Sequence, residues 1–340
     1  MLDTIALLDE KLIPAWQQPV SVLDLLAARQ LNLETALLGS SLFLSDAPFT
    51  GHKINPIQFQ QLLQSAQKLW RDQDFYFQLG HRLLANGIGP LKDALYHVHS
   101  LSQWTDLIGE FALLLSPTIY CRDYTINAHE RFLLFSSNIG LPLNSLQHRT
   151  LLVLISQLIK RSEKNWRVEF YLSENTPSDV DQFYVHVAGK CYFSSPFNGV
   201  RIRQKNNNDE GHHMDISTQV AINQCRDTLG EKRYLLPYVA ELLWSNHQLT
   251  LNDTAEHIDT SPATLKRKLA SCRVSFQALS DQMKAERAVI ELLLKGTSLE
   301  QISNNLCFHD SSNFRRAFKR WTGMTPSSLK SAYRGIFEPS

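Results

Sequence analysis

One helical pattern occurs twice in the last hundred or so residues, and it constrains the fold more than any other feature of the chain. The first copy is Leu249–Leu269 and the second is Ser298–Phe318, a shift of 49 positions (298 − 249). Each copy reads as a short amphipathic helix, a short polar turn, and a second helix with basic residues between its apolar ones. This is the sequence form of a helix-turn-helix, so the chain carries two such motifs.

Residues at the turns support this interpretation. Ser261 can cap the second helix of the first copy by accepting a backbone N–H bond. Pro262 suits the first helical position, because its missing N–H would have no partner there. In the second copy Asp310 can cap the following helix in the same way. Both second helices therefore have a defined start.

Each second helix has one apolar and one polar face. Leu265 and Leu269 are four apart and face the core in the first copy, as Phe314 and Phe318 do in the second. The outward residues, which we expect to contact DNA bases and phosphates, are Ala263, Thr264, Lys266, Arg267, Ser311, Ser312, Arg315 and Arg316. A solvated basic face on a helical bundle is the alternative. Two capped turns with matching faces favour DNA binding.

A family resemblance covers about 100 residues (231–340) of this region. Phe308–Ser327 closely resembles the signature of AraC/XylS-type bacterial transcription regulators, and Ser261–Leu269 and Glu286–Leu293 are similar to the rest of that domain. The resemblance implies an activator that binds double-stranded promoter DNA and contacts RNA polymerase. Cys307 stands where the family usually has Gly, and Ser303 where it usually has Ala. A left-handed turn at Cys307 would be strained and would make the base contacts of the second copy less certain.

The remaining elements predict an α+β domain before an all-α one. The first hundred residues have helical spacing, and a hairpin, a helix and two strands follow at 118–136, 146–160, 167–172 and 198–203. We expect an α+β effector-binding and dimerisation domain at 1–210, a linker region at 211–230, and an all-α DNA-binding domain at 231–340. In that last domain, a long helix at Phe276–Lys295 joins the two motifs.

The N-terminal domain resembles the sensor domain of the ornithine-responsive subgroup of these regulators, on short patches such as Gly89–Leu95 and Pro196–Arg201. The subgroup implies a small-molecule effector and a homodimer. An apolar pocket with one Arg or His that holds a carboxylate is the chemistry we favour, with Tyr96, His97 and Arg122 as the candidate effector-binding residues. The alternatives are that these three are satisfied core or interface residues, and that the domain only dimerises while DNA binding is constitutive.

Composition indicates a cytoplasmic protein with no membrane segment. The chain has 340 residues, 43% of them hydrophobic and 20% charged, as in an ordinary soluble protein. No apolar run reaches the length of a membrane span, and the start, Met1–Glu10, has acids where a secretion signal has lysines. The five cysteines are scattered, which predicts reduced thiols and neither a disulfide framework nor a zinc site.

Three other functions are disfavoured. Residues 230–340 hold 15 Lys+Arg against 11 Asp+Glu, a net charge of +4 (15 − 11), which is low for a non-specific architectural DNA protein. No cysteine has the setting of the methyl-transfer domain fused to this DNA-binding type in one family, and no hydrolase or phosphate-loop motif occurs, so we expect no enzyme. The pairs His97/His99 and His212/His213 lack further ligands, so we expect no metal and no cofactor.

Overall fold

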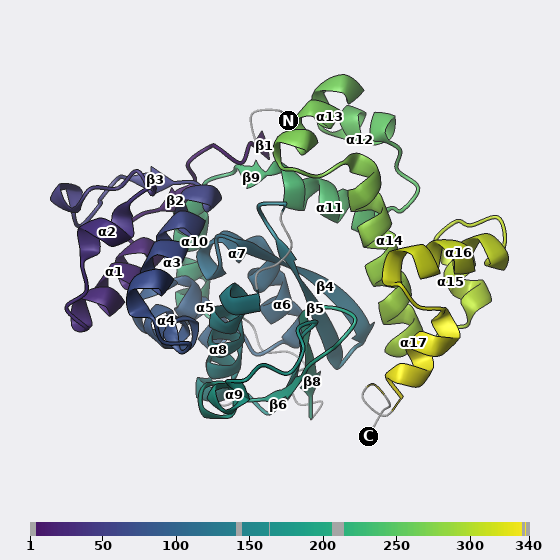
Figure 1. Cartoon of the computed structure of the whole chain (residues 1–340), viewed down its shortest axis with the longest axis horizontal. Helices are drawn as coiled ribbons and strands as arrows, with labels where there is room; N and C mark the ends of the chain where they lie inside the picture. The colour runs from purple at the N-terminus through teal and green to yellow at the C-terminus, as the bar shows by residue number, and fades with distance from the viewer. Residues whose placement is uncertain (1–4, 141–144, 163, 206–213, 335–336, 338–340) are drawn as a thin grey trace. The chain divides into compact units, whose positions relative to one another are not determined.

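The computed structural model describes residues 5–140, 145–162, 164–205, 214–334 and 337. The chain divides into two compact units, which Figure 1 traces by residue number. The N-terminal unit consists of Ala6–Ser194 and Asn198–Lys232, and the C-terminal unit consists chiefly of Arg233–Ser340. Within the described residues, no helix combines the length and the apolar character needed to cross a membrane.

Helices dominate the N-terminal unit before its sheet, as the apolar spacing predicts. Asn55 caps α3, because Asn55 and Gln58 exchange side-chain to backbone hydrogen bonds of 2.9 and 3.0 Å. The elements are β1 (Ile5–Ala6), β2 (Ile13–Pro14), α1 (Gln18–Ala28), α2 (Leu33–Leu37), the 3-10 turn η2 (Leu44–Asp46), β3 (Lys53–Ile54), α3 (Pro56–Trp70), α4 (Phe75–Arg82), the π-helical turn η3 (Leu83–Gly87), α5 (Leu91–His97), α6 (Leu101–Glu110) and α7 (Ala112–Leu115).

A five-stranded sheet in the order β4-β5-β8-β6-β7 confirms the α+β prediction. Its elements and the helices between them are β4 (Ile119–Asn127), β5 (Glu130–Ser137), α8 (Ser145–Arg161), β6 (Trp166–Tyr171), α9 (Val180–His186), β7 (Lys190–Tyr192) and β8 (Gly199–Gln204). The predicted hairpin is β4–β5, and β8 lies between β5 and β6 with antiparallel pairing to both. The short β7 pairs in parallel with β6, and the sequence analysis missed it.

The two faces of the sheet differ in chemistry. One face carries apolar side chains such as Cys121, Phe135 and Val200, which belong to the hydrophobic core beneath α6 and α8. Because strand residues alternate, Arg122 and Arg201 point to the other face. There Arg122 Nη1 donates to the Tyr120 hydroxyl at 2.9 Å, and further Arg–Glu pairs follow across β5, β8 and β6. The apolar face therefore holds the helices, and the polar face has its own charge network.

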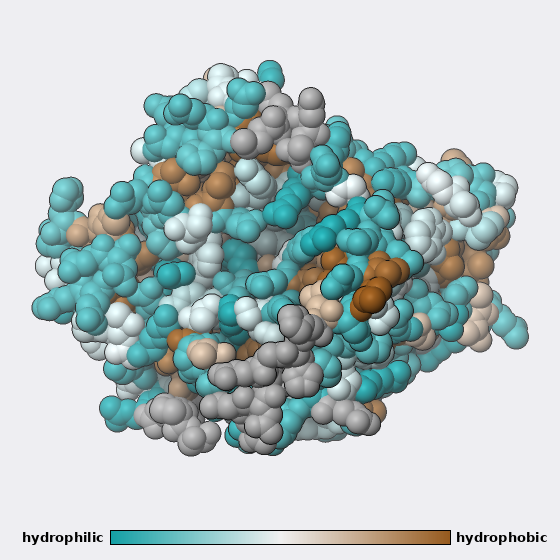
Figure 2. Space-filling model, turned by 180° about the vertical axis from the view of Figure 1, so that it is seen from behind, coloured by the Kyte–Doolittle hydropathy of each residue, from teal (hydrophilic) through white to brown (hydrophobic). Residues whose placement is uncertain are grey.

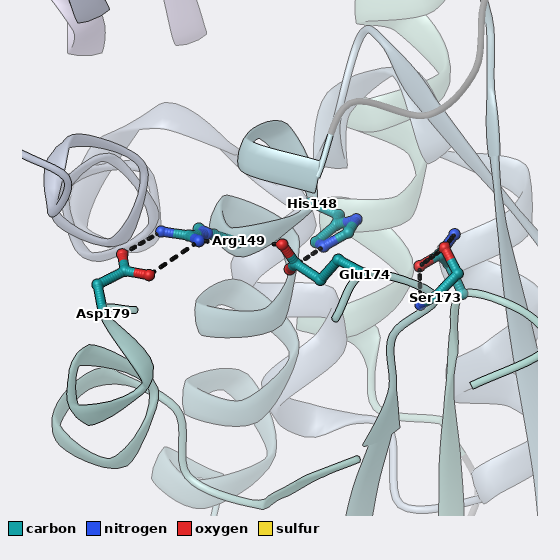
Figure 3. Close-up of polar contacts among 6 residues, drawn as sticks. His148, Arg149, Ser173, Glu174 and Asp179 are labelled. Carbon is teal, nitrogen blue, oxygen red and sulfur yellow. Dashed lines mark hydrogen bonds and ion pairs between the residues drawn. The ribbon is translucent and has the colours of Figure 1, made fainter. Parts of the chain in front are cut away.

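A buried polar cluster ties α8 to the segment before α9. His148 Nε2 lies 3.2 Å from Glu174 Oε1, and Arg149 donates two bonds to Asp179 at 2.5 and 3.2 Å (Figure 3). His148 and Arg149 are both almost fully buried, so leaving the Arg149 charge without Asp179 would be costly. The cluster fixes the position of α8 against the chain that leads into α9.

The segment expected as a linker region, 211–230, is described from residue 214 onward, and this part is largely helical. Helix α10 (Ile216–Leu229) begins after Asp215, whose side chain accepts the Thr218 N–H at 2.9 Å, and it packs against α5. Ala221, Ile222 and Cys225 are its buried apolar residues. By its contacts α10 belongs to the N-terminal unit. The polar stretch at 206–213, and with it His212/His213, lies outside the described residues.

The C-terminal unit is helical, as predicted. Its elements are β9 (Arg233–Tyr234), α11 (Leu235–Ser245), α12 (Leu251–His257), α13 (Pro262–Ser271), α14 (Phe276–Leu293), α15 (Leu299–Asn305), α16 (Ser311–Thr322) and α17 (Pro326–Ala332). The long helix α14 ends in a left-handed turn at Gly296, where the Thr297 N–H donates to the Glu291 carbonyl at 3.0 Å. Figure 1 shows α14 running between the pair α12/α13 and the pair α15/α16.

Candidate DNA-binding surface

The first helix-turn-helix consists of α12 and α13. Asp259 closes α12 in a left-handed conformation (φ 56°), and the Thr260 N–H donates to the Ala255 carbonyl at 2.9 Å. Ser261 then caps α13 as predicted, accepting the Thr264 N–H at 3.2 Å, with Pro262 at the first helical position. These contacts set the angle at which α13 leaves the turn.

The second helix-turn-helix, α15 and α16, repeats this geometry with a turn that is one residue longer. Its left-handed residue lies 48 positions after that of the first motif (307 − 259), and its cap lies 49 positions after (310 − 261). Cys307 has φ 60°, and the Phe308 N–H donates to the Ser303 carbonyl at 2.9 Å. Asp310 caps α16 by accepting the Asn313 N–H at 2.7 Å. Turn residue, backbone bond and cap therefore correspond one to one in the two motifs.

Burial separates the inner and outer faces of the second helices as expected. Leu265 and Leu269 of α13 and Phe314 and Phe318 of α16 are fully buried. Of the eight predicted contact residues, Thr264 and Ser311 are half-buried, and the six exposed ones are Ala263, Lys266, Arg267, Ser312, Arg315 and Arg316. Each motif thus presents two adjacent basic side chains on the outer face of its second helix.

Asn313 belongs to this surface and was missed in the sequence analysis. The shift of 49 places it at the position of Thr264, which was included (264 + 49 = 313). Asn313 is exposed; its Nδ2 donates to Asp310 Oδ2 at 2.7 Å and its Oδ1 accepts from Arg316 Nη2 at 2.6 Å. The side chain therefore links the helix cap to the guanidinium and orients Arg316. Comparing the two copies position by position would have found it.

Helix α14 joins the two motifs along the chain. It contacts α11, α15 and α16, and its 18 residues span about 27 Å at 1.5 Å per residue. The buried Glu291 near its end accepts from Arg287 Nε at 3.0 Å and from Asn305 Nδ2, at the end of α15, at 3.1 Å. Arg287 also lies over the Trp244 ring of α11, 5.3 Å from its centroid. Glu291 and Arg287 thus connect α11, α14 and α15 through side chains.

Comparison with known proteins agrees with this geometry. The family description "Helix-turn-helix domain" matches residues 254–332. The ornithine utilization regulator of Pseudomonas aeruginosa is 38% identical over 82 residues, covering 24% of each chain. The HTH-type transcriptional regulator GadX of Escherichia coli is 30% identical over 84 residues, covering 25% of this chain and 31% of the relative. This part of the chain is an AraC-type helix-turn-helix domain.

The similarity to these relatives is confined to the AraC-type domain. The matched stretches span about a quarter to a third of the length of the curated relatives. Among solved structures, the transcriptional regulator CdpR from Pseudomonas aeruginosa aligns over 92% of this chain and 98% of its own, at 15% identity and a TM-score of 0.40.

Two residues depart from the AraC-type pattern, and both lie in the second motif. Cys307 adopts the left-handed conformation that was predicted for it, which is unfavourable for a residue with a side chain. Ser303 is 2% exposed, and its Oγ has no hydrogen-bond partner among the described residues. Ala255 holds the equivalent buried position in the first motif. The second motif therefore has two unfavourable features at its turn, the conformation of Cys307 and the buried hydroxyl of Ser303. The first motif has Asp259 and Ala255 at these two positions.

The candidate effector residues do not come together in one place. Tyr96 and His97 lie at the end of α5, where Tyr96 is half-buried and His97 is exposed, with its Nδ1 2.7 Å from the Asp93 carbonyl. Burial raises the pKa of Tyr96 above its usual value. Arg122 points to the polar face of the sheet, away from the apolar face on which α6 packs. Their role in effector binding remains a prediction.

Other chemistry was sought in the N-terminal unit. Ser173 Oγ donates to Asn198 Oδ1 at 3.2 Å, and Figure 3 shows it apart from His148, so these two residues do not form a nucleophile–base pair. Over the ranges that the structure describes, no cluster of three or more His, Cys, Asp or Glu is arranged to hold a metal ion.

Proposed function

We propose that the protein is a sequence-specific transcription regulator that inserts α13 and α16 into two successive major-groove segments of promoter DNA. The observation that carries this is the repetition of turn, cap and basic face in two motifs that one long helix connects. Since α14 spans about 27 Å, it suits two reading helices on one DNA face, roughly one helical turn of about 34 Å apart.

Within each motif we assign the arginines to base edges. Arg267 and Arg316 hold equivalent exposed positions, and an arginine bonded to guanine O6 and N7 contributes about 1–3 kcal/mol of discrimination. Lys266 and Arg315, one residue earlier, are assigned to phosphates or bases beside them. The Asn313–Arg316 bond supports this assignment for α16, because it fixes one guanidinium before DNA arrives.

We assign effector control and dimerisation to the N-terminal unit, and transcriptional activation through RNA polymerase in the cytoplasm to the whole chain. The support is that this unit has its own hydrophobic core and sheet, more than DNA contact requires. The ornithine utilization regulator has an AraC-type domain similar to this one, which fits control by a small carboxylate-bearing metabolite. The alternative is a constitutive regulator whose N-terminal unit only dimerises.

DNA recognition is tested by selecting sites for the full chain from a random library and then measuring affinity by fluorescence anisotropy. Arg267→Ala should lose tenfold or more affinity for the selected site, about 1.4 kcal/mol or more, and less for random DNA. Lys53→Ala, an exposed basic change in the N-terminal unit, should leave both affinities unchanged. If Arg267→Ala loses the same affinity for the selected site and for random DNA, Arg267 contacts only phosphate. If the selection enriches no site, the proposal is overturned.

Effector control is tested by thermal-shift screening of metabolites against the full chain. A ligand at about 100 times its Kd should stabilise its unit by about 2.7 kcal/mol. Arg122→Gln and His97→Gln should each reduce the shift if those residues hold a carboxylate. If no metabolite stabilises the chain and it activates its promoter constitutively, the result would favour the alternative, in which the N-terminal unit only dimerises.

A further inference from the structure

Helix α10 has an exposed apolar outer face that its own fold does not use. Ile216 is 80% exposed and Val220, one turn later, is 48% exposed. On a wheel of 3.6 residues per turn these two and Asn223 lie within about 60° of one another. Figure 2 shows a compact hydrophobic patch amid hydrophilic surface in the region where α10 lies. The helix is anchored from its other side by Ala221 and Cys225, so the outer pair is not needed for folding.

A groove lies beside this face, between α10 and α6. Its apolar residues are Leu107, Ile222 and Met214, and its volume is about 360 Å³. The rim is polar and charged, with Asp106 of α6 and Arg226 of α10. The groove has room for branched aliphatic side chains, and it lies along the same helix as the exposed pair.

We propose that α10 pairs with α10 of a second copy in antiparallel orientation, and that Ile216 of each copy enters the groove of the other. In an isologous pair whose two-fold axis passes beside Ala221, Ile216 comes level with Arg226 of the other copy (216 + 226 = 442) and Gln219 with Asn223 (219 + 223 = 442). Arg226 lines one end of the groove along α10, so each exposed isoleucine meets that end of the groove opposite it. Ridge and groove are therefore self-complementary, as a two-fold interface requires.

The charges at the ends of α10 agree with this pairing. Asp215, at the N-terminal end, and Arg226, near the C-terminal end, lie on the same flank of the helix. A two-fold axis brings like flanks together, so Asp215 of one copy approaches Arg226 of the other. Arg226 already holds Glu110 at 2.8 Å, and the second carboxylate would share its remaining donors. A parallel pair would instead keep Asp215 of one copy and Arg226 of the other at opposite ends of the helices.

This inference rests on the dimer in the proposed function and gives it a surface. The test compares the full chain with Ile216→Glu by sedimentation equilibrium over 0.1–100 µM (about three decades around typical dimer affinities). The wild type should be dimeric, and Ile216→Glu should raise its dimer Kd at least tenfold. The control is Val185→Glu on α9, an equally drastic change at a residue 73% exposed, which should dimerise as the wild type does. Circular dichroism should show all three folded, because neither side chain is buried.

A cross-link gives a second readout. In a Cys307→Ser background, which removes the exposed thiol, Val220→Cys should form an intermolecular disulfide on mild oxidation and Val185→Cys should not. The α10 interface would be overturned, while the dimer itself stands, by either of two results. One is that Ile216→Glu dimerises as the wild type does, and the other is that Val220→Cys and Val185→Cys cross-link equally. A wild type that stays monomeric at 100 µM would overturn both, and DNA binding would be judged separately by the anisotropy assay.

Discussion

Asn305 Nδ2 donates a hydrogen bond to Oε2 of the buried Glu291 at 3.1 Å, and this contact joins the last turn of the connecting helix α14 to α15 of the second motif. The other carboxylate oxygen accepts from Arg287 Nε at 3.0 Å. Glu291 is only 5% exposed, so its charge depends on these two donors. The orientation of α15, and through it α16, is therefore coupled to a buried charge on α14.

Replacing this charge should affect one half of the DNA site. Glu291→Gln keeps the shape but loses the charge-assisted bond to Arg287, and we expect about 1–3 kcal/mol of destabilisation. Footprinting of the selected site should show weaker protection of the segment read by α16, with the α13 segment retained. The exposed Glu300→Gln is the matched control and should change neither result. Uniform weakening of both segments would argue against this coupling.

Cys307→Gly should stabilise the second motif. The residue has φ 60°, where a side chain costs about 1–2 kcal/mol, while glycine loses about 0.5–1 kcal/mol to the freedom of the unfolded chain. The net gain is about 0.5–1 kcal/mol, measured as a higher urea midpoint for the C-terminal unit. Asp259→Gly is the internal control at φ 56°, and it should gain less, because aspartate tolerates this conformation better.

Ser303→Ala should be stabilising for an independent reason. A buried hydroxyl without a hydrogen bond costs about 1–3 kcal/mol, and the methyl group of alanine already fits at the equivalent Ala255. Hydrogen exchange at α15 should slow in this variant. Ser312→Ala, on the exposed face of α16, should leave exchange unchanged. Faster exchange in Ser303→Ala would mean that the hydroxyl has a partner, such as a bound water.

The sequence was sufficient where local chemistry determines structure. The caps at Ser261 and Asp310 and the hairpin β4–β5 depend on residues close together in the chain, and all were predicted. Strand β7 was missed because its three residues pair in parallel with β6, and only the tertiary fold brings them together. The helical pattern of α10 can be read from the sequence, but its packing on the core of the N-terminal unit cannot, because its burial depends on the distant α5. An effector site depends on such distant contacts throughout, so sequence patterns could not locate it.

Asn313 and Arg316 should act as one unit in DNA recognition. Their 2.6 Å bond fixes the guanidinium, so removing either side chain should remove most of what the pair contributes. In a double-mutant cycle, Asn313→Ala and Arg316→Ala should each weaken binding to the selected site, and the double variant should lose clearly less than the sum. A second cycle of Asn313→Ala with Arg267→Ala, across the two motifs, should be additive. Additivity in the first cycle would mean that Asn313 contacts DNA independently or not at all.

The stability of the C-terminal unit should fall in acid because of His247. His247 lies next to the Trp244 ring. Burial, and after it the nearby charges of Arg287 and Lys284, lower the pKa of His247 from its ordinary 6.5 to about 4. The unfolded chain takes up a proton below pH 6.5 that the folded unit does not bind until about pH 4. The free energy of unfolding should therefore be unaffected above pH 6.5 and should decrease as the pH falls from 6.5 to 4.

The measurement is the urea midpoint of the full chain at pH 7.5, 6.0 and 5.0, followed by tryptophan fluorescence. His247→Gln removes the titrating group, so its midpoint should fall less between pH 7.5 and 5.0 than that of the wild type. The exposed His309→Gln controls for the loss of a histidine as such and should keep the wild-type slope. If His247→Gln instead retains the full acid sensitivity, the proton is taken up elsewhere, and the packing of Trp244 and Arg287 around His247 does not set the response.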